Sequence, residues 1–194
     1  MVEADIALDG AAQRVLEFAH ARIILEPVIA RALLRPGAAL ALVLAMAGGA
    51  AAAPAKPAAP AFSAKLLDEE RTLDSRALIG KKVVVLRFQG SWCKVCTAQA
   101  PGIQRLAEKF GPRGVEVIGV HVNDTSADAR AWRKRYKQTY PAALDQGARI
   151  GTRFGFKRAP YTVVIDKKGE MISRIHGSAD EARLTKIIEP LLKP

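Results

Sequence analysis

Short apolar runs beyond residue 80 predict the strands of a sheet. Three of them, at 83–88, 115–122 and 161–166, are nearly continuous and rich in valine and isoleucine. Runs of this length, bounded by turn residues, are typical of strands that are buried on both faces of a sheet. The segment 171–176 follows a turn at 167–169 and alternates apolar with polar residues, which predicts an antiparallel partner for the third run.

Helical periodicity separates these strands. Apolar residues between 103 and 110 recur at three- and four-residue spacing until Gly111-Pro112 ends the pattern, and 180–192 is a second amphipathic stretch. The other expected elements are a short strand or hairpin at 62–73, a helix from a cap at Ser126 or Asp128 to Lys137, an extended segment at 140–145 and one or two helical turns at 148–154. This order predicts an α/β fold with a central mixed sheet covered by helices on both faces.

The only two cysteines of the chain, Cys93 and Cys96, follow the first apolar run and a turn at Gly90. Residues three apart on a helix are close enough for the separation of about 4.4 to 6.8 Å between Cα atoms that a disulfide requires. The positive end of the helix dipole and the cation of Lys94 both stabilise a thiolate at Cys93, below the free pKa of about 8.5. We therefore predict that Cys93 is a redox nucleophile and Cys96 the resolving thiol.

Other interpretations of this pair remain open. Two buried structural cysteines would need no chemistry, and a closed zinc site needs four ligands, whereas the chain adds only His20, His121 and His176, none in a paired spacing. A Cu(I)-binding module that holds the metal through both thiolates, with His121 or His176, is an alternative of a different class. A thiol peroxidase is a third alternative, but the paired CxxC does not require this function and the chain has no separate peroxidatic cysteine. The strand-to-helix context favours redox chemistry.

The N-terminal third differs in composition from the rest. Residues 38–53 carry no charge and are almost entirely small or apolar, Arg31 and Arg35 precede them, and alanines around residue 53 offer a cleavage site. This pattern predicts a secretory signal or, if it is not cleaved, a membrane anchor. Residues 1–30 are net acidic, where a signal peptide has a basic start, so we hypothesise that translation begins near Val28 or Ile29.

The predicted organisation follows from this composition. Export places the cysteines in an oxidising compartment such as the periplasm, where a disulfide persists. The exported part is expected to be soluble after signal cleavage or anchored at its N-terminus. The expected regions are an N-terminal extension with the signal or anchor at 1–55, an extended Pro/Ala linker without fold at 56–61 and one domain at 62–194.

The chain is strongly basic. Its net charge is +11, and residues 56–194 alone hold 26 Lys or Arg against 14 Asp or Glu, a net of +12. Five of these cations, at 130, 133, 134, 135 and 137, lie on the expected helix around Trp132 and Tyr136, where a solvated face is the common explanation. An exported protein seldom meets nucleic acid, so we expect no such partner. Attraction to an anionic membrane surface or to acidic partner proteins is the functional alternative.

With this order in view, the chain resembles the thioredoxin superfamily, and most specifically the TlpA/ResA-like thiol-disulfide oxidoreductases of bacterial envelopes. The matching residues are 88–96, Pro101, 117–124, Tyr140-Pro141 and 159–166 followed by Gly169. The resemblance covers about 62–194. It implies a thioredoxin-like fold, an enzyme that exchanges disulfides with protein substrates, a membrane electron donor, and no cofactor or metal besides the redox-active disulfide. Apocytochrome c maturation and copper-centre assembly are the candidate processes.

The resemblance also implies roles for residues that spacing alone would not single out. Pro160 matches a cis-proline opposite the CxxC, which shapes a groove where a partner segment pairs with the backbone of Ala159. Asp124 matches an acidic position near the active site, so it is expected to tune or accept the proton of a thiol. Trp92 and Tyr161 are the further expected contacts of a substrate.

Three residues depart from the family pattern. Val95 stands where most relatives have proline, Lys94 adds a cation between the thiols, and Arg87 stands where thioredoxin has a buried aspartate. If Arg87 and Lys94 approach the sulfurs, both stabilise the thiolate and therefore the reduced form. The reduction potential of this disulfide would then lie above that of thioredoxin, which is about −270 mV. The alternative for Arg87 is a side chain turned to solvent.

Overall fold

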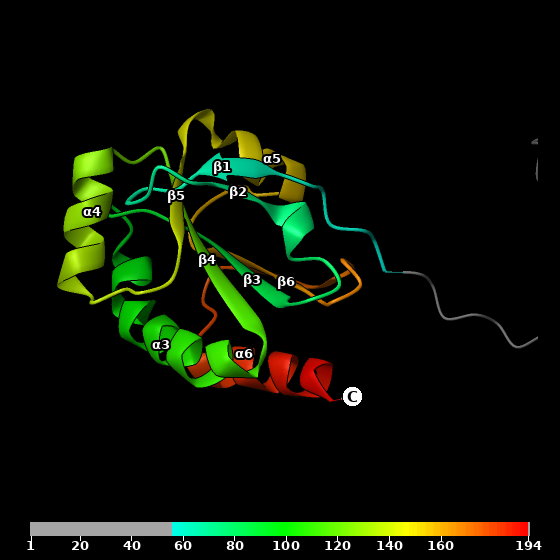
Figure 1. Cartoon of the computed structure of the whole chain (residues 1–194). Coiled ribbons are helices and arrows are strands. Elements are labelled where there is room, and N and C mark those ends of the chain that lie inside the picture. Colours follow the sequence, from blue (N-terminus) through cyan, green and yellow to red (C-terminus); the bar gives the residue numbers. More distant parts are fainter. Residues whose placement is uncertain (1–55, 194) are drawn as a thin grey trace, which may run out of the picture. The chain divides into compact units, whose positions relative to one another are not determined.

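The computed structural model describes residues 56–193, which contain a five-stranded mixed sheet with the strand order β5-β4-β3-β6-β7 (Figure 1). Strands β3, β4 and β5 run parallel, whereas β6 is antiparallel to β3 and β7 is antiparallel to β6. The predicted mixed sheet and its C-terminal hairpin are therefore confirmed. The strands are β3 (Val83–Gln89), β4 (Val115–Val122), β5 (Ala142–Asp145), β6 (Tyr161–Ile165) and β7 (Met171–His176).

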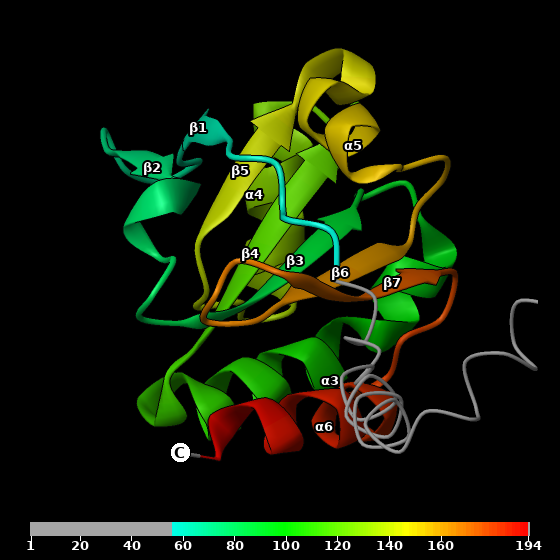
Figure 2. The same cartoon turned by 90° about the vertical axis from the view of Figure 1, so that its right-hand side faces the viewer.

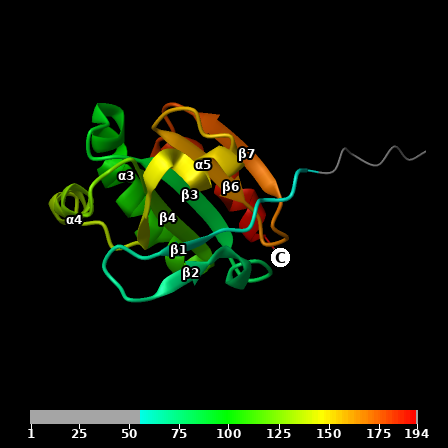
Figure 3. The ribbon, with the colours of Figure 1, turned by 90° about the horizontal axis from the view of Figure 1, so that it is seen from above.

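Helices cover both faces of this sheet. Figures 1 and 2 show α3 (Lys94–Phe110) and α6 (Glu181–Ile188) under one face, with α5 (Arg149–Phe154) and a small hairpin of β1 (Ser63–Lys65) and β2 (Thr72–Asp74) over the other. Seen from above, α5 lies over the sheet, whose strands β4, β3, β6 and β7 are labelled in Figure 3. The predicted fold class is confirmed. The remaining helices are α4 (Ser126–Arg135), beside β5, and 3-10 turns at Ser75–Ala77, Gly111–Arg113, Gln146–Ala148 and Glu189–Leu192.

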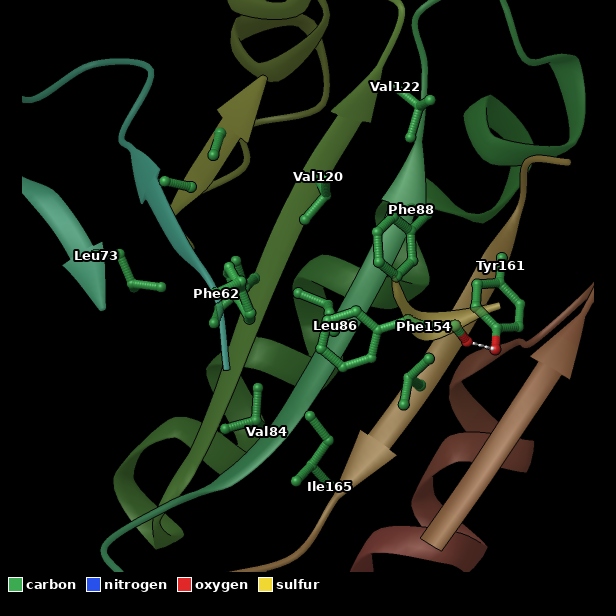
Figure 4. Packing of buried hydrophobic residues seen from close by; sticks show 14 of the residues in the cluster. Phe62, Leu73, Val84, Leu86, Phe88, Val120, Val122, Phe154, Tyr161 and Ile165 are labelled. Carbon is green, nitrogen blue, oxygen red and sulfur yellow. Dashed lines mark hydrogen bonds between the residues drawn. The ribbon is translucent and has the colours of Figure 1, made fainter. Parts of the chain in front are cut away.

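Strand β3 is the centre of the core, and all seven of its residues are buried. Because side chains alternate along a strand, Val84, Leu86 and Phe88 face α5 and the β1–β2 hairpin, as Figure 4 shows. The ring of Phe88 lies 5.6 Å from that of Tyr161, centroid to centroid. The intervening residues face α3 and α6, and this brings Arg87 under the N-terminal half of α3.

The structure corrects the predicted cap of α4. Thr125, not Ser126 or Asp128, is the N-cap: it has an extended backbone, and its hydroxyl oxygen accepts a hydrogen bond from the N–H of Asp128 at 3.0 Å. The helix ends at Arg135 rather than Lys137. Lys137 has a positive φ of 50°, which is incompatible with a continuing right-handed helix.

Part of the expected linker pairs with the sheet. The N–H of Ala59 donates to the carbonyl of Gly169 at 2.8 Å, and the N–H of Met171 donates to the carbonyl of Pro57 at 2.9 Å. The tract is extended, as predicted, but the expectation that it carries no fold is wrong for these residues. The backbone N–H and C=O groups of an extended segment need hydrogen-bond partners, and here Gly169 and Met171 provide them.

The signal or anchor expected within residues 1–55, and the start expected near residue 28, lie outside the described residues. Within 56–193, no helix is both long enough and apolar enough to cross a bilayer.

Candidate active site

The two cysteines lie at the N-terminus of α3, directly after the turn that follows β3. They form a disulfide, and their Cα atoms are 5.2 Å apart, as the spacing predicted. Cys93 is the N-cap residue, and its sulfur accepts a hydrogen bond from the backbone N–H of Cys96 at 3.2 Å. A thiolate in this position would also meet the positive end of the helix dipole. Cys93 is 6% exposed and Cys96 2%, so Cys93 is the more accessible sulfur.

The turn before Cys93 depends on a glycine and a tryptophan. A Cβ atom on Gly90 would lie 2.5 Å from Nε1 of Trp92, so a side chain at this position would displace the indole ring. Nε1 of Trp92 donates a hydrogen bond to the carbonyl of Val122 at 3.2 Å. Trp92 nevertheless remains 56% exposed and Val95 48% exposed. These two side chains flank the disulfide as an exposed apolar surface.

The loop before β6 brings a second segment to the cysteines. The Ala159–Pro160 peptide bond is cis, as the resemblance implies. Ala159 packs against a cluster that contains Cys93, Cys96 and Trp132. Ala159 therefore lies next to the cluster that contains the disulfide, and the groove for a partner segment stays a prediction.

Tyr161 does not have the expected position of a substrate contact. Its side chain is fully buried, and its hydroxyl donates to the carbonyl of Phe154 at 2.7 Å, the dashed line in Figure 4. Its ring stacks on Phe88 on one side and on His176 on the other. The alternation of β6 directs this side chain into the core, so the sequence expectation for its side chain is corrected.

Asp124 holds the turn that carries the CxxC. Its carboxylate accepts hydrogen bonds from the N–H and the hydroxyl of Ser91, both at 2.7 Å, and lies 2.9 Å from Nδ1 of His121. Desolvation at this 3% exposed site raises the pKa of Asp124, but the hydrogen bonds from Ser91 and His121 outweigh it and hold the pKa below its ordinary value. The carboxylate is therefore ionised at neutral pH. It is bound to Ser91, which precedes Cys93 by two residues.

His121 is the buried partner of Asp124. Its Nε2 lies 3.0 Å from the amide nitrogen of Gln89, and its ring meets that of Trp132 edge-on, with centroids 5.3 Å apart. Because a carboxylate can only accept, Nδ1 donates to Asp124 and Nε2 accepts from Gln89, which is the pattern of a neutral imidazole. Desolvation lowers the pKa of His121 and outweighs the opposing influence of Asp124.

Sequence reasoning considered His121 only as a metal ligand and missed this pairing. The available signal was a histidine within an apolar strand, three residues before the aspartate. Gln89, Ser91 and Gln99 were missed as well, because nothing in their spacing distinguishes them from ordinary polar residues.

Acid is expected to destabilise the protein through this pair in two successive ranges of pH. Below the ordinary pKa of 6.5, the unfolded chain protonates His121 while the folded chain keeps it neutral, so stability falls. The pKa of Asp124 is also lowered by folding, so its contribution is present above its ordinary value of 3.8 and is lost as the pH falls through the lower native value. Urea unfolding midpoints between pH 7 and 3 measure both effects.

The matched variants for this prediction are His121→Gln and His176→Gln. His121→Gln removes the proton uptake and is expected to flatten the decline between about pH 7 and pH 5. His176→Gln removes an exposed histidine instead and is the matched control for the loss of an imidazole. Equal slopes in His121→Gln and the unmodified chain would contradict a neutral, buried His121.

Arg87 is buried under α3 and is 1% exposed, so the alternative of a side chain turned to solvent is wrong. Its Nη1 donates to the hydroxyl of Thr162 at 2.7 Å and its Nη2 to the amide oxygen of Gln99 at 2.5 Å. Desolvation lowers the pKa of Arg87 to about 10, which leaves the guanidinium charged at neutral pH. Gln99 lies one helical turn after Cys96, so this cation lies beneath the first turns of α3.

The other cations singled out in the sequence differ in whether they form ion pairs. Lys94 is exposed at the first position of α3. On α4, Arg130 and Arg133 both form ion pairs with Asp68. The basic helix is therefore only partly a free solvated face.

The histidines proposed as copper ligands are not directed at the cysteines. Both ring nitrogens of His121 have partners, and His176 stacks on Tyr161 with ring centroids 4.4 Å apart. Across residues 56–193, no three His, Cys, Asp or Glu side chains are grouped as ligands of a metal ion. The placement of these histidines gives the Cu(I) alternative no support.

Comparison with known proteins agrees with this geometry. The AhpC/TSA family model matches residues 55–174. The thiol-disulfide oxidoreductase ResA of Bacillus thuringiensis subsp. konkukian (strain 97-27) is 31% identical over 110 residues, which cover 57% of this chain and 64% of ResA. The thiol:disulfide interchange protein HelX of Rhodobacter capsulatus is 30% identical over 135 residues, covering 69% of this chain and 74% of HelX.

A solved structure supports the fold. The thiol:disulfide interchange protein of the thioredoxin family from Chlorobium tepidum TLS superposes with a TM-score of 0.67, at 23% identity, over 73% of this chain and 100% of that one. The predicted thioredoxin-like architecture is thereby confirmed. The family model, the two relatives and the position of the CxxC agree, and the chain therefore belongs to the AhpC/TSA family, with thiol-disulfide oxidoreductases among its relatives.

Proposed function

We propose that this protein is an exported thiol-disulfide oxidoreductase that reduces disulfides of protein substrates. The observation that carries the proposal is the Cys93–Cys96 disulfide at the N-terminus of α3, next to Ala159 and the cis bond to Pro160. A helix N-terminus stabilises the thiolate that such chemistry needs. The similarity to ResA and HelX supports the same class of reaction.

The proposed cycle moves two electrons to the partner. The Cys93 thiolate attacks one sulfur of the partner's disulfide, so that bond breaks, a mixed disulfide forms and the departing partner thiolate takes up a proton. The Cys96 thiolate then attacks the sulfur of Cys93, which releases the second partner thiol and leaves the Cys93–Cys96 disulfide. A membrane electron donor is proposed to reduce this disulfide again. The enzyme needs no cofactor besides its own cysteines.

The surrounding residues have proposed roles in this cycle. Trp92 and the backbone of Ala159 contact the partner segment, and Pro160 shapes the groove that receives it. Asp124 tunes the thiols, because its carboxylate accepts two hydrogen bonds from Ser91 in the turn before Cys93. Arg87 and Lys94 favour the thiolate and so the reduced form.

Location and substrate are proposed from the sequence. Residues 1–55 would carry the signal or anchor and 56–61 the connection to the domain, which places the cysteines in the periplasm or an equivalent compartment. The resemblance to TlpA/ResA-like proteins makes apocytochrome c maturation and copper-centre assembly the candidate processes. The basic charge supports contact with an anionic membrane surface.

A redox titration of the full-length chain tests the proposed function. In thiol/disulfide buffers, with free thiols trapped by alkylation, we expect one reversible two-electron transition that both Cys93→Ser and Cys96→Ser abolish. A midpoint near −270 mV is that of a reductant, whereas one between about −180 and −120 mV is that of an isomerase or oxidant. Thiols that show no transition would contradict the redox function.

A further inference from the structure

Four exposed cations belong to three separate segments that contribute residues to the cluster around the disulfide. Lys94 stands between the two cysteines, and Lys157 and Arg158 immediately precede Ala159, which packs against them. The fourth is Arg135 at the end of α4, whose guanidinium carbon lies 5.6 Å from the ring centroid of Tyr136. Tyr136 packs against the same cluster as the cysteines. We call these four residues the cationic rim.

The cationic rim has no carboxylate of its own. Among residues 56–193, none of the four cations forms an ion pair, whereas Arg130 and Arg133 on α4 share an ion pair with Asp68. The carboxylates of neighbouring elements are engaged elsewhere: Asp124 with Ser91 and His121, Asp128 with Thr125, Asp180 with the N–H of Arg183, and Glu181 with Arg105. The positive charge at the disulfide is therefore open to a partner.

The centre of this face is apolar. Trp92 and Val95 are 56% and 48% exposed, and both adjoin the cysteines in the sequence. Exposed apolar side chains surrounded by charge are typical of a surface that another molecule covers. An interface of this kind fits a segment with apolar residues at its centre and carboxylates at its edges.

We propose that the protein selects substrates whose disulfide is flanked by acidic residues. This inference rests on the proposed function and adds the chemical class of the partner segment. Opposite charges accelerate the encounter and orient the segment before the sulfurs meet. A polypeptide fits better than a membrane surface, because each of the cations lies within two positions in the sequence of a residue of the disulfide cluster, and a bilayer on this face would block every protein substrate.

The test uses the reduced full-length chain and three synthetic peptides. Each peptide contains the same apolar core with one intramolecular disulfide, flanked by glutamates, by lysines or by uncharged residues. We expect the acidic peptide to be reduced about tenfold faster than the basic one at low ionic strength, with a ratio that falls towards one at about 0.5 M salt. The uncharged peptide reports the chemical step without steering.

The double variant Lys157→Glu, Arg158→Glu is expected to abolish or reverse this preference while it still reduces the uncharged peptide. The double variant Lys109→Glu, Lys186→Glu makes the same change of charge on α3 and α6 and is expected to keep the preference. Lys109 lies sixteen residues after Cys93, which is about 24 Å along the helix.

Equal rates for acidic and basic peptides would overturn the inference but leave the proposed function intact. If none of the three peptides is reduced, the proposed function fails and the inference fails with it. Vesicles of anionic phospholipid provide the remaining comparison. Equal peptide rates together with vesicle binding that requires Lys157 and Arg158 would assign the cationic rim to a membrane instead.

Discussion

Cys93→Ser is expected to lower the rate of disulfide exchange by on the order of a thousandfold or more, the scale of losing a covalent nucleophile. Cys96→Ser is expected to block the cycle at a different step. Its Cys93 can still attack a substrate, but no thiol is present to release the product, so a mixed disulfide accumulates. Nonreducing electrophoresis and intact-mass measurements with a disulfide-containing peptide distinguish the two variants.

The difference between the two cysteines follows from their places on α3. The sulfur of Cys93 is at the N-cap and is the more exposed one, whereas Cys96 is one turn deeper and almost completely buried. Both serine variants preserve size and the cap, because serine is a good N-cap residue and differs from cysteine by one atom. A stable adduct in Cys93→Ser rather than in Cys96→Ser would reverse the assigned roles.

Arg87→Met is expected to make the disulfide less oxidising, by about 30 mV, the equivalent of about 1.4 kcal/mol for two electrons. Arg87 is charged at neutral pH, and both of its hydrogen-bond acceptors, Thr162 and Gln99, are neutral. A cation without a counter-ion, bound to Gln99 in the first turns of α3, is expected to favour thiolates over the disulfide. Redox titration measures the shift, and the pH dependence of alkylation reports the accompanying loss of thiolate.

Two further variants separate charge from packing in this prediction. Arg87→Lys keeps the cation but breaks the two-pronged hydrogen bonding, so it is expected to lose stability while its potential stays close to that of the unmodified chain. Arg105→Met removes an exposed arginine that pairs with Glu181, with the same change of net charge. An unchanged potential in Arg87→Met would contradict a role of this cation in the redox balance.

Two buried polar arrangements thus lie under the CxxC. On one side Arg87 joins β3, β6 and α3 through Thr162 and Gln99. On the other side His121 and Asp124 join β4 to the turn before Cys93. Within these two arrangements, the only buried side-chain nitrogen or oxygen without a partner among the described residues is Nε of Arg87. Substitutions in either arrangement therefore leave groups unsatisfied and act on the cysteines through structure as well as charge.

Much of the fold could be predicted because its signals are local. The apolar runs at 83–88, 115–122 and 161–166 are strands in the structure, and the hairpin after the turn at 167–169 forms as expected. Strand burial and helix periodicity depend on neighbouring residues, which are visible in a sequence. Local signals were weaker at the cap of α4, because Thr125, Ser126 and Asp128 all have side chains that can cap a helix. Thr125 is the N-cap because its backbone is extended and the helix begins at the next residue.

The spacing of the only two cysteines, before a predicted helix, was enough to expect a disulfide from the sequence alone. The surroundings of that disulfide could not be predicted in the same way. Arg87 meets Thr162 across 75 residues of chain, and Asp124 meets Ser91 across 33. The four residues of the cationic rim likewise come from three segments that are separate in the sequence. Contacts of this kind depend on how distant elements pack against one sheet, and no periodicity along the chain records them.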